Sequence, residues 1–318
     1  MASKQVVWFP VRDDANGEEV SVPIGIAEGD RDGAALTVVG GVHGTEYAAQ
    51  DAVARFWDEL DPAALSGRVF VVLAADPTAI IGHSAYVSPS DGKNMNRVWP
   101  GDAEGTLTER IAHLITTECV LRSDAVIDVH GGEWDEDIDC FIITHRIGDQ
   151  ELDTRTLDLA MALGFTYVEV TDADGAVLGA GTGSGEAVRG GRPGLTLEAG
   201  GAGQRDPAYI DMHVHALRNA LRHLGILEGA PILYDGAPVL LDHGVLMKTT
   251  TEGLYVPKVR VGQWVEVGDV FAEVRGFDGE LLEQLTCPER GTVLDVIIAR
   301  AIKAGGFAGK LGILPDAG

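Results

Sequence analysis

The sequence predicts an α/β fold: a mixed, mostly parallel sheet with helices on both faces, followed by a small all-β domain. Over the first two thirds of the 318 residues, short runs rich in Val, Ile and Leu alternate with segments of helical periodicity. This alternation is typical of a buried sheet covered by helices. After the break EGAPI at 228–232, helical spacing gives way to short Val-rich segments separated by glycine. We therefore expect one domain at 1–230 and a second at 231–318.

The individual elements of the first domain follow from these patterns. Apolar runs rich in β-branched residues predict strands at 35–40, 68–74, 125–130, 140–144, 167–170 and 194–198. Amphipathic spacing predicts helices at 47–60, 106–121, 151–163 and 211–224. Thr106 and Glu109 have the spacing of a capping box, which supports the start of the second helix.

The second domain has the cadence of a β sandwich. Residues 256–274 alternate apolar and polar side chains, with Gly262 and Gly268 expected in turns. This cadence resembles the barrel-sandwich fold of biotinyl and lipoyl carrier domains, so a binding or carrier protein is one alternative function. The modified lysine of those domains lies on the hairpin that follows the cadence, but here 274–280 reads VRGFDGE. Lys248 precedes the cadence, and we expect it to be an ordinary solvated lysine.

Composition restricts the partners and the compartment. There are 49 acidic and 24 basic side chains, a net charge of −25, which argues against nucleic acid and anionic membranes as partners. No apolar run approaches the roughly 18 residues of a membrane helix, and no signal peptide is visible, so we expect a cytoplasmic protein. A homo-oligomer is compatible with the sequence. The three cysteines are far apart and are expected to be reduced thiols in or near the core: Cys119, Cys140 and Cys287.

Polar residues at the ends of three predicted strands indicate a metal site. His43 and Glu46 follow the strand at 35–40 on a glycine-flanked turn, where an imidazole and a carboxylate can face one cation. His130 ends the strand at 125–130, and Glu198 ends the strand at 194–198. In open α/β sheets, ligands bind at the carboxyl ends of strands. Glu133 forms a second H-x-x-E pair with His130, but it leads into an acidic run, and we expect it at a solvated rim.

Four motifs resemble, in order, the signatures of the succinylglutamate desuccinylase and aspartoacylase family, relatives of the zinc carboxypeptidases. They are GGVHGTE at 40–46, DGKNMNR at 91–97 followed by VWPG, IDVH at 127–130 and LTLEAGG at 195–201. The resemblance spans most of the chain, including the β domain that many members carry. It implies one Zn²⁺ per chain held by His43, Glu46 and His130, with Glu198 as the general base. Zinc activates water and polarises a carbonyl, and Glu198 would pass the proton of the water to the leaving amine.

The resemblance also implies roles around the metal. Asp128, on the same strand face as His130, could orient that imidazole. Asn96 and Arg97 match the family's substrate-anchoring pair, in which a guanidinium grips a carboxylate through two parallel hydrogen bonds, so Arg97 joins Glu198 among the catalytic candidates. Two further arginines could hold a second substrate carboxylate or lie at the surface: Arg189 and Arg192.

The sequence departs from some members of the family upstream of the Asn-Arg pair. Aspartoacylase-like proteins carry another arginine there, but this chain has none between Arg68 and Arg97. Lys93 is the one cation in that stretch and is an imperfect substitute. Asn94 stands where many members have an acid. Which cation helps to polarise the carbonyl is therefore open.

These residues predict a cytoplasmic zinc-dependent amidohydrolase that removes a small acyl group from an N-acylated amino acid or related amine. Within the resembled family, aspartoacylase, succinylglutamate desuccinylase and N-acetyl-diaminobutyrate deacetylase activities fit this expectation. One alternative is a carboxypeptidase-like hydrolase of a peptide or amino-acid conjugate with the same zinc chemistry. A non-catalytic binding or carrier protein is the alternative from another class.

Overall fold

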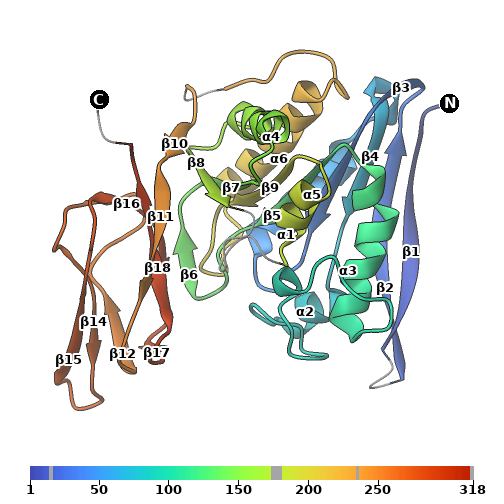
Figure 1. The fold of residues 1–318 in the computed structure, drawn as a ribbon. Coiled ribbons are helices and arrows are strands. Elements are labelled where there is room, and N and C mark those ends of the chain that lie inside the picture. The colour runs from blue at the N-terminus through green and yellow to red at the C-terminus, as the bar shows by residue number, and fades with distance from the viewer. Residues whose placement is uncertain (14–16, 173–180, 234–235, 316–318) are drawn as a thin grey trace.

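The computed structural model describes residues 1–13, 17–172, 181–233 and 236–315. Its larger part is built on a nine-stranded sheet with the order β1-β2-β4-β3-β5-β9-β7-β8-β10 (Figure 1). The central strands pair in parallel, whereas β1 with β2, β2 with β4, and β7 with β9 pair antiparallel. The bounds are β1 Ser3–Asp13, β2 Glu18–Glu28, β3 Arg31–Gly40, β4 Ser66–Val72, β5 Ala125–His130, β7 Phe141–Arg146, β8 Tyr167–Asp172, β9 Gly194–Glu198 and β10 Val239–Leu241.

Helices cover both faces of this sheet, as the sequence predicts. Neighbouring residues of a strand point to opposite faces: Val38 packs in the core that includes α1, α4 and α6, and Val39 in the core that includes α3. The helices are α1 Tyr47–Glu59, α2 Pro77–Gly82, α3 Leu107–Glu118, α4 Gln150–Ala162, α5 Gly183–Arg189 and α6 Pro207–His223. Three short 3₁₀ helices are η1 Pro62–Ala64, η2 Met95–Arg97 and η3 Val120–Arg122.

The six predicted strands and four predicted helices are all present, with bounds that differ by a few residues. The helix predicted at 106–121 ends at Glu118 and continues as η3, whereas the helix predicted at 211–224 already begins at Pro207. The backbone nitrogen of Thr106 donates to Glu109 Oε2 at 2.9 Å, as a capping box requires. The sequence did not predict β1, β2, α2, α5, β10 or the short strand β6 (Glu136–Ile138).

The smaller part consists of two antiparallel sheets with a common core. One sheet has the order β11-β18-β16-β13, and the other β15-β14-β12-β17. Gly262 and Gly268 have positive φ angles of 72° and 89°, as expected for turns, and the three cysteines are buried free thiols. The bounds are β11 His243–Lys248, β12 Gly253–Pro257, β13 Trp264–Val265, β14 Val270–Arg275, β15 Leu281–Thr286, β16 Gly291–Ile297, β17 Ala301–Ile302 and β18 Phe307–Ile313.

Two strands join the larger and smaller parts. Strand β6 (Glu136–Ile138) follows β5 in the chain but pairs with β16 of the smaller part, and in Figure 1 it lies beside the C-terminal strands. Strand β10 lies beyond residue 230 but pairs with β8 in the nine-stranded sheet. The domain boundary at 230 therefore stays a prediction, with the sheet extending past it.

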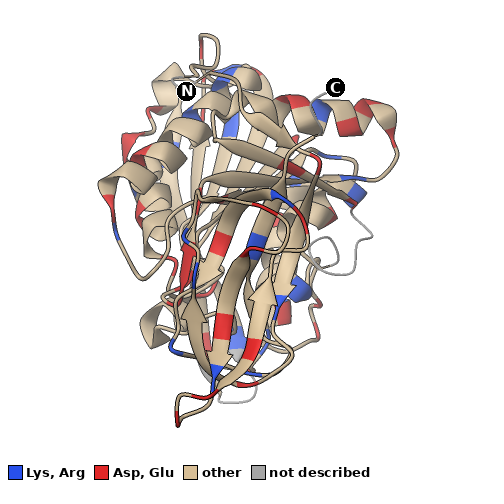
Figure 2. Cartoon of the chain, turned by 90° about the vertical axis from the view of Figure 1, so that its left-hand side faces the viewer, with Lys and Arg blue, Asp and Glu red and all other residues tan. Residues whose placement is uncertain are grey.

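Charged residues of both signs are spread over the molecule. Figure 2 shows acidic positions spread over helices and over the C-terminal strands, with basic positions between them. Among the described residues, no helix combines the length and the apolar character needed to cross a membrane.

Candidate active site

The carboxyl ends of three parallel strands meet at one edge of the sheet. His43 and Glu46 follow β3, His130 ends β5 and Glu198 ends β9. Strands β3, β5 and β9 are neighbours, and His130 and Glu198 are directly paired in register. All four residues line one cavity of about 370 Å³. The structure thus brings together the residues that the strand-end argument selected.

The turn that carries His43 and Glu46 depends on close backbone packing. A Cβ on Gly44 would lie 2.6 Å from the carbonyl oxygen of Ser84 and closer still to that of Ala79 in α2. The backbone nitrogen of Gly44 donates to Ser84 at 3.0 Å, and Gln50 of α1 donates to the His43 carbonyl at 2.9 Å. Glycine is therefore required at 44, where α2 packs closely, and α1 and the segment after α2 hold the turn in place.

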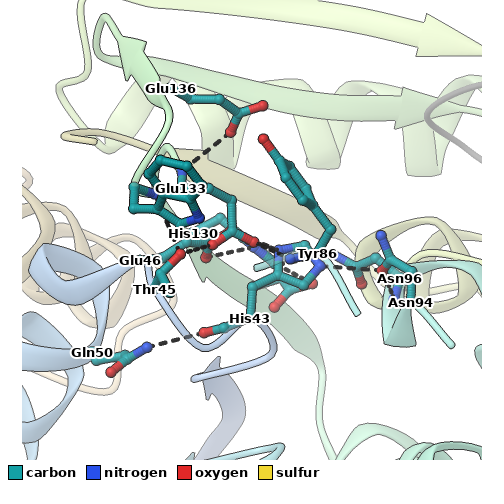
Figure 3. A network of polar contacts seen from close by, with 12 residues as sticks. His43, Thr45, Glu46, Gln50, Tyr86, Asn94, Asn96, His130, Glu133 and Glu136 are labelled. Atoms are coloured by element: carbon teal, nitrogen blue, oxygen red, sulfur yellow. Dashed lines mark hydrogen bonds and ion pairs between the residues drawn. The ribbon is translucent and has the colours of Figure 1, made fainter. Parts of the chain in front are cut away.

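Three side chains offer ligand atoms to one point. Nδ1 of His43 lies 2.6 Å from Glu46 Oε1, and Nδ1 of His130 lies 3.0 Å from Glu46 Oε2 (Figure 3). One ligand atom from each residue falls within 4.8 Å of the others. Two imidazoles and one carboxylate are a donor set typical of a catalytic zinc site with an open fourth position.

The outer nitrogens of both imidazoles also have partners. Nε2 of His43 lies 3.1 Å from Asn94 Oδ1, which also accepts from a backbone amide, so Nε2 is a donor and Nδ1 is the nitrogen that could bind a cation in place of its own proton. Nε2 of His130 lies 2.9 Å from Asn96 Nδ2 and 3.1 Å from Asp128 Oδ2. Neither carboxylate oxygen of Asp128 makes a hydrogen bond within the described residues.

The three candidate ligands shift one another's pKa values strongly. Burial lowers the pKa of His43, but the carboxylate of Glu46 outweighs it and raises the value to about 9. Burial also opposes ionisation of Glu46, yet His130 and His43 bring its pKa down to about 2. An acid that stays ionised between two imidazoles presents negative charge where a cation would bind.

A second group of carboxyl groups surrounds these ligands. Burial, reinforced by nearby Glu46, raises the pKa of Glu198 to about 8 and that of Glu133 to about 7. The pKa of Glu136 is also raised to about 7, chiefly by burial. Raised carboxyl pKa values in a cavity are typical of sites that move protons.

The expectation that Glu133 lies at a solvated rim is wrong. Its side chain is 1% exposed, and its Oε1 lies 3.6 Å from His43 Nδ1. Thr45 donates to its other oxygen, and the Tyr86 backbone donates to Oε1. Figure 3 shows the Glu133 side chain among the candidate ligands instead of at a solvated rim.

The predicted cations are placed differently from one another. Arg97 lines the cavity, donates to the Asn96 carbonyl at 2.6 Å, and has no carboxylate within ion-pair distance among the described residues. Lys93 pairs with Glu109 at 2.7 Å instead and does not line the cavity. Arg189 and Arg192 line a separate cavity, so their predicted role in holding a substrate carboxylate finds no support in this placement.

The C-terminal sheets complete the cavity wall. Five of their residues line it together with the candidate metal ligands: Leu246, Lys248, Asp295, Phe307 and Lys310. The ammonium of Lys310 binds Glu169 of β8. Lys248 is exposed, as expected for a solvated lysine, and it also lines the cavity.

Comparison with known proteins decides the family. Residues 32–224 match the family described as "Succinylglutamate desuccinylase/Aspartoacylase catalytic domain". The chain belongs to this family. A curated relative, N-alpha-acetyl-L-2,4-diaminobutyric acid deacetylase from Halomonas elongata, is 31% identical over 261 residues, which cover 80% of this chain and 74% of the relative. The resemblance predicted from four motifs is confirmed, and the chain is a member of a deacylase family.

Solved structures support the family assignment over almost the whole chain. A succinylglutamate desuccinylase/aspartoacylase from Rhodobacter sphaeroides has a TM-score of 0.87 and 25% identity, over 98% of this chain and 96% of that one. The product-bound ectoine utilization protein EutE (DoeB) from Ruegeria pomeroyi also has a TM-score of 0.87 and 25% identity, over 98% and 95%. A metallo-carboxypeptidase from Burkholderia cenocepacia, at 15% identity, 70% and 65% coverage and a TM-score of 0.54, shares the fold.

Sequence reasoning missed the residues that reach this site from outside the parallel strands. Glu136 and Asp295 lie on the paired strands β6 and β16, and Tyr86 lies in the segment after α2. A carboxylate that directly follows a metal-ligand motif is a signal that could have identified Glu133. No signal of that kind marks Asp295, because its position depends on how the two parts of the chain pack.

Proposed function

We propose that this protein is a zinc-dependent deacylase that hydrolyses the amide bond of a small N-acyl amino acid or related N-acylated amine. The main support is a single cavity in a member of this family that contains His43, Glu46 and His130 beside Glu198. Arg97 also lines it and has no ion-pair partner in the part of the chain that the structure describes. Cytoplasmic location and a homo-oligomeric state remain predictions from the sequence.

The residues present fit a single zinc ion. His43, Glu46 and His130 would hold it, with Nδ1 of each ring facing Glu46. Asn94 accepts from Nε2 of His43 and fixes the tautomer that leaves Nδ1 free. The unpartnered carboxylate of Asp128 can accept from Nε2 of His130 once Nδ1 of that ring binds a cation. When bound, zinc acts as a Lewis acid that polarises the amide carbonyl and lowers the pKa of water.

Glu198 is the group we propose to move the proton. Its carboxylate takes a proton from the attacking water and later delivers it to the leaving nitrogen. Burial already raises the pKa of Glu198 to about 8, which makes it a better acceptor than an exposed glutamate. A cation at the neighbouring ligands favours the ionised form needed for the first step.

Arg97 is the group we propose to bind the substrate carboxylate. Its guanidinium has no carboxylate partner among the described residues, and burial lowers its pKa without removing its charge at neutral pH. The side-chain oxygen of Asn96 accepts from Trp99 Nε1 at 3.1 Å, and its Nδ2 lies 2.9 Å from His130 Nε2. Once His130 Nε2 carries a proton that it donates to Asp128, it cannot accept from Asn96 Nδ2. That amide group can then donate to the substrate, and we assign both Asn96 and Arg97 to substrate binding.

The size of the cavity and the relative's name suggest the acyl group. A volume of about 370 Å³ suits a small molecule and is too confined for a folded partner. The relative from Halomonas elongata is named for an N-acetylated diamino acid. N-acetyl amino acids, including N-acetyl-2,4-diaminobutyrate, are therefore the first substrates to test.

A substrate panel tests this proposal. N-acetyl, N-succinyl and N-formyl amino acids, together with short peptides, are incubated with the zinc-loaded protein, and release of the acid or amino acid is measured. We expect hydrolysis of an N-acyl amino acid, and a kcat lower by about 10²–10⁴-fold in Glu198→Gln with zinc still bound. Preference for peptides would favour the carboxypeptidase-like alternative. No hydrolysis, with a mass increase on Lys248, would favour the carrier alternative.

A further inference from the structure

The C-terminal sheets place an unpaired carboxylate in the wall of the active-site cavity. The side chain of Asp295 in β16 is 8% exposed and lines the cavity. Its Oδ1 is buried and has no hydrogen-bond partner among the described residues. A buried carboxylate without partners is unfavourable by several kcal/mol unless something compensates for it. A ligand in the cavity could supply that compensation.

A β-bulge directs Asp295 into the cavity. The register between β16 and β18 shifts between Val293 and Asp295. Val293 and Val296 both pack in the core of the smaller part, whereas Leu294 packs in a cluster with residues of β7 and β10. Without the extra residue, alternation would turn Asp295 toward the same core as Val293. The bulge therefore exposes this carboxylate to the cavity instead.

The nearest lysine does not neutralise Asp295. Lys310 lies directly opposite it in the strand register, but the Lys310 ammonium is bound to Glu169. Within the described residues, no lysine or arginine lies within ion-pair distance of the Asp295 carboxylate. The other charged groups around it are mostly acidic: Glu136, Asp137 and Glu198. This corner of the cavity therefore has more carboxyl groups than cations, and a bound cation would favour their ionised forms.

We propose that Asp295, supported by Glu136, binds the side-chain ammonium of the substrate and selects N-acylated diamino acids over neutral ones. This inference rests on the proposed deacylase function, since it adds a third contact to Glu198 at the amide and Arg97 at the carboxylate. A cationic group fits this corner because it would pair with Oδ1 of Asp295, which has no hydrogen-bond partner among the described residues. Burial and the neighbouring Glu136 hold the pKa of Asp295 well above its usual range, and a ligand ammonium would reverse that effect.

Three substrates of similar size test the charge preference. N-acetyl-2,4-diaminobutyrate carries a side-chain ammonium, N-acetyl-2-aminobutyrate lacks it, and N-acetylaspartate carries the opposite charge. We expect kcat/KM of the parent to be about 10- to 100-fold higher for the first compound than for the second, and lowest for the third. Equal values for the first two compounds would overturn the inference without any variant, and would leave the deacylase function intact.

The variant Asp295→Asn locates the preference. We expect kcat/KM for the cationic substrate to fall by about 10- to 100-fold, while that for the neutral substrate stays within about twofold. Asp278→Asn is the matched control, because Asp278 lies on an exposed turn of the same part, and it should change neither value. A preference that survives Asp295→Asn contradicts the assignment. If Asp295→Asn does not fold, the comparison in the parent still decides.

Binding of the products separates the two proposals. Calorimetric titration measures the affinity of the zinc-loaded protein for 2,4-diaminobutyrate and for 2-aminobutyrate. If no amide is hydrolysed, the deacylase proposal fails. The cation site is then supported by tighter binding of the diamino acid that is lost in Asp295→Asn, and it is overturned by equal binding.

Discussion

At the scale of single residues, the site contains three carboxyl groups whose pKa values are raised to neutral pH or slightly above. Glu133 and Glu136 have pKa values raised to about 7, and Glu198 to about 8, chiefly because burial disfavours the charged form. The cost of ionising them in the folded state lowers stability, and it is tolerated because the cavity needs acids at these positions.

Glu136 allows this cost to be measured. Its pKa is about 7 in the folded protein against 4.5 ordinarily, so ionisation destabilises the folded state fully above pH 7 and not at all below about pH 4.5. We expect Glu136→Gln to raise the free energy of unfolding of the metal-free protein by about 1–3 kcal/mol at pH 8, and to leave it nearly unchanged at pH 5. Urea unfolding at the two pH values measures the difference.

The exposed Glu280 provides the control for that measurement. Glu280→Gln removes a charge from a surface turn and should have the same small effect at both pH values. If Glu136→Gln is no more stabilising at pH 8 than at pH 5, the raised pKa of Glu136 is wrong.

The sequence identified the residues whose position follows from a strand end. His43, His130 and Glu198 could be found because parallel strands deliver their carboxyl ends to one edge. Glu133 was misplaced because the direction of the Gly131-Gly132 turn depends on Thr45 and Tyr86, which are distant in sequence.

At the scale of elements, the turn between β3 and α1 sets the metal ligands. Its backbone is fixed by Ser84, two residues after α2, which accepts from the Gly44 amide, and by α1 through Gln50. The Ala79 carbonyl of α2 packs directly against Gly44. The amino end of α2 is held by Asp76, whose Oδ1 accepts from the Thr78 and Ala79 amides at 3.0 and 3.1 Å. Ligand geometry therefore depends on a helix that supplies no ligand.

Gly44→Ala tests this dependence. The added methyl group would press on the backbone carbonyls of Ala79 and Ser84, which cannot rotate away. We expect the free energy of unfolding to fall by about 1–3 kcal/mol and the zinc affinity to weaken, because His43 and Glu46 move apart. Denaturant unfolding and a competitive zinc titration measure the two effects.

Gly82→Ala, at the end of α2, is the matched control for Gly44→Ala. A Cβ at Gly82 would lie 3.4 Å from Pro89 Cγ, an ordinary contact. This variant should change stability by less than about 1 kcal/mol and leave zinc affinity unchanged. Equal zinc affinity in Gly44→Ala and the parent would show that α2 does not position the ligands.

The elements that could be predicted are those with a buried apolar pattern. Strands β5 and β9 lie in the centre of the sheet and appear as continuous apolar runs. Strand β1 is an edge strand in which Trp8 is exposed and Val11 is among the few buried side chains, so its sequence carries little pattern. Strand β10 has three residues, too few for any periodicity.

At the scale of the whole molecule, the C-terminal part closes the catalytic cavity. Strand β6 pairs with β16, and Lys310 of β18 binds Glu169 of β8, with both side chains buried. The sequence predicted a β domain with a separate core but gave no means of placing it on the sheet. The contribution of Asp295 could not be anticipated for that reason.

The Lys310–Glu169 pair links the two parts energetically. Lys310→Met leaves the Glu169 carboxylate buried without its partner, and we expect the free energy of unfolding to fall by about 3–5 kcal/mol. The double variant Glu169→Gln/Lys310→Met removes both charges and should recover most of that loss. Chemical denaturation with a single transition measures all three proteins.

An exposed ion pair provides the control for the stability cost of breaking the buried pair. Arg146→Met disrupts the pair with Asp172, whose side chains are 58% and 68% exposed, and should cost less than about 1 kcal/mol. A double variant as unstable as Lys310→Met alone would mean that packing, and not charge, accounts for the loss.

The central claim is that zinc held by His43, Glu46 and His130 enables this chain to hydrolyse an N-acyl amino acid. The most direct measurement is acetate release from N-acetyl-2,4-diaminobutyrate while zinc is titrated into chelator-treated protein. The account predicts no activity without metal, a linear rise to one zinc per chain, and a plateau beyond it. Full activity of the metal-free protein, or a rise that does not depend on His43, would contradict it.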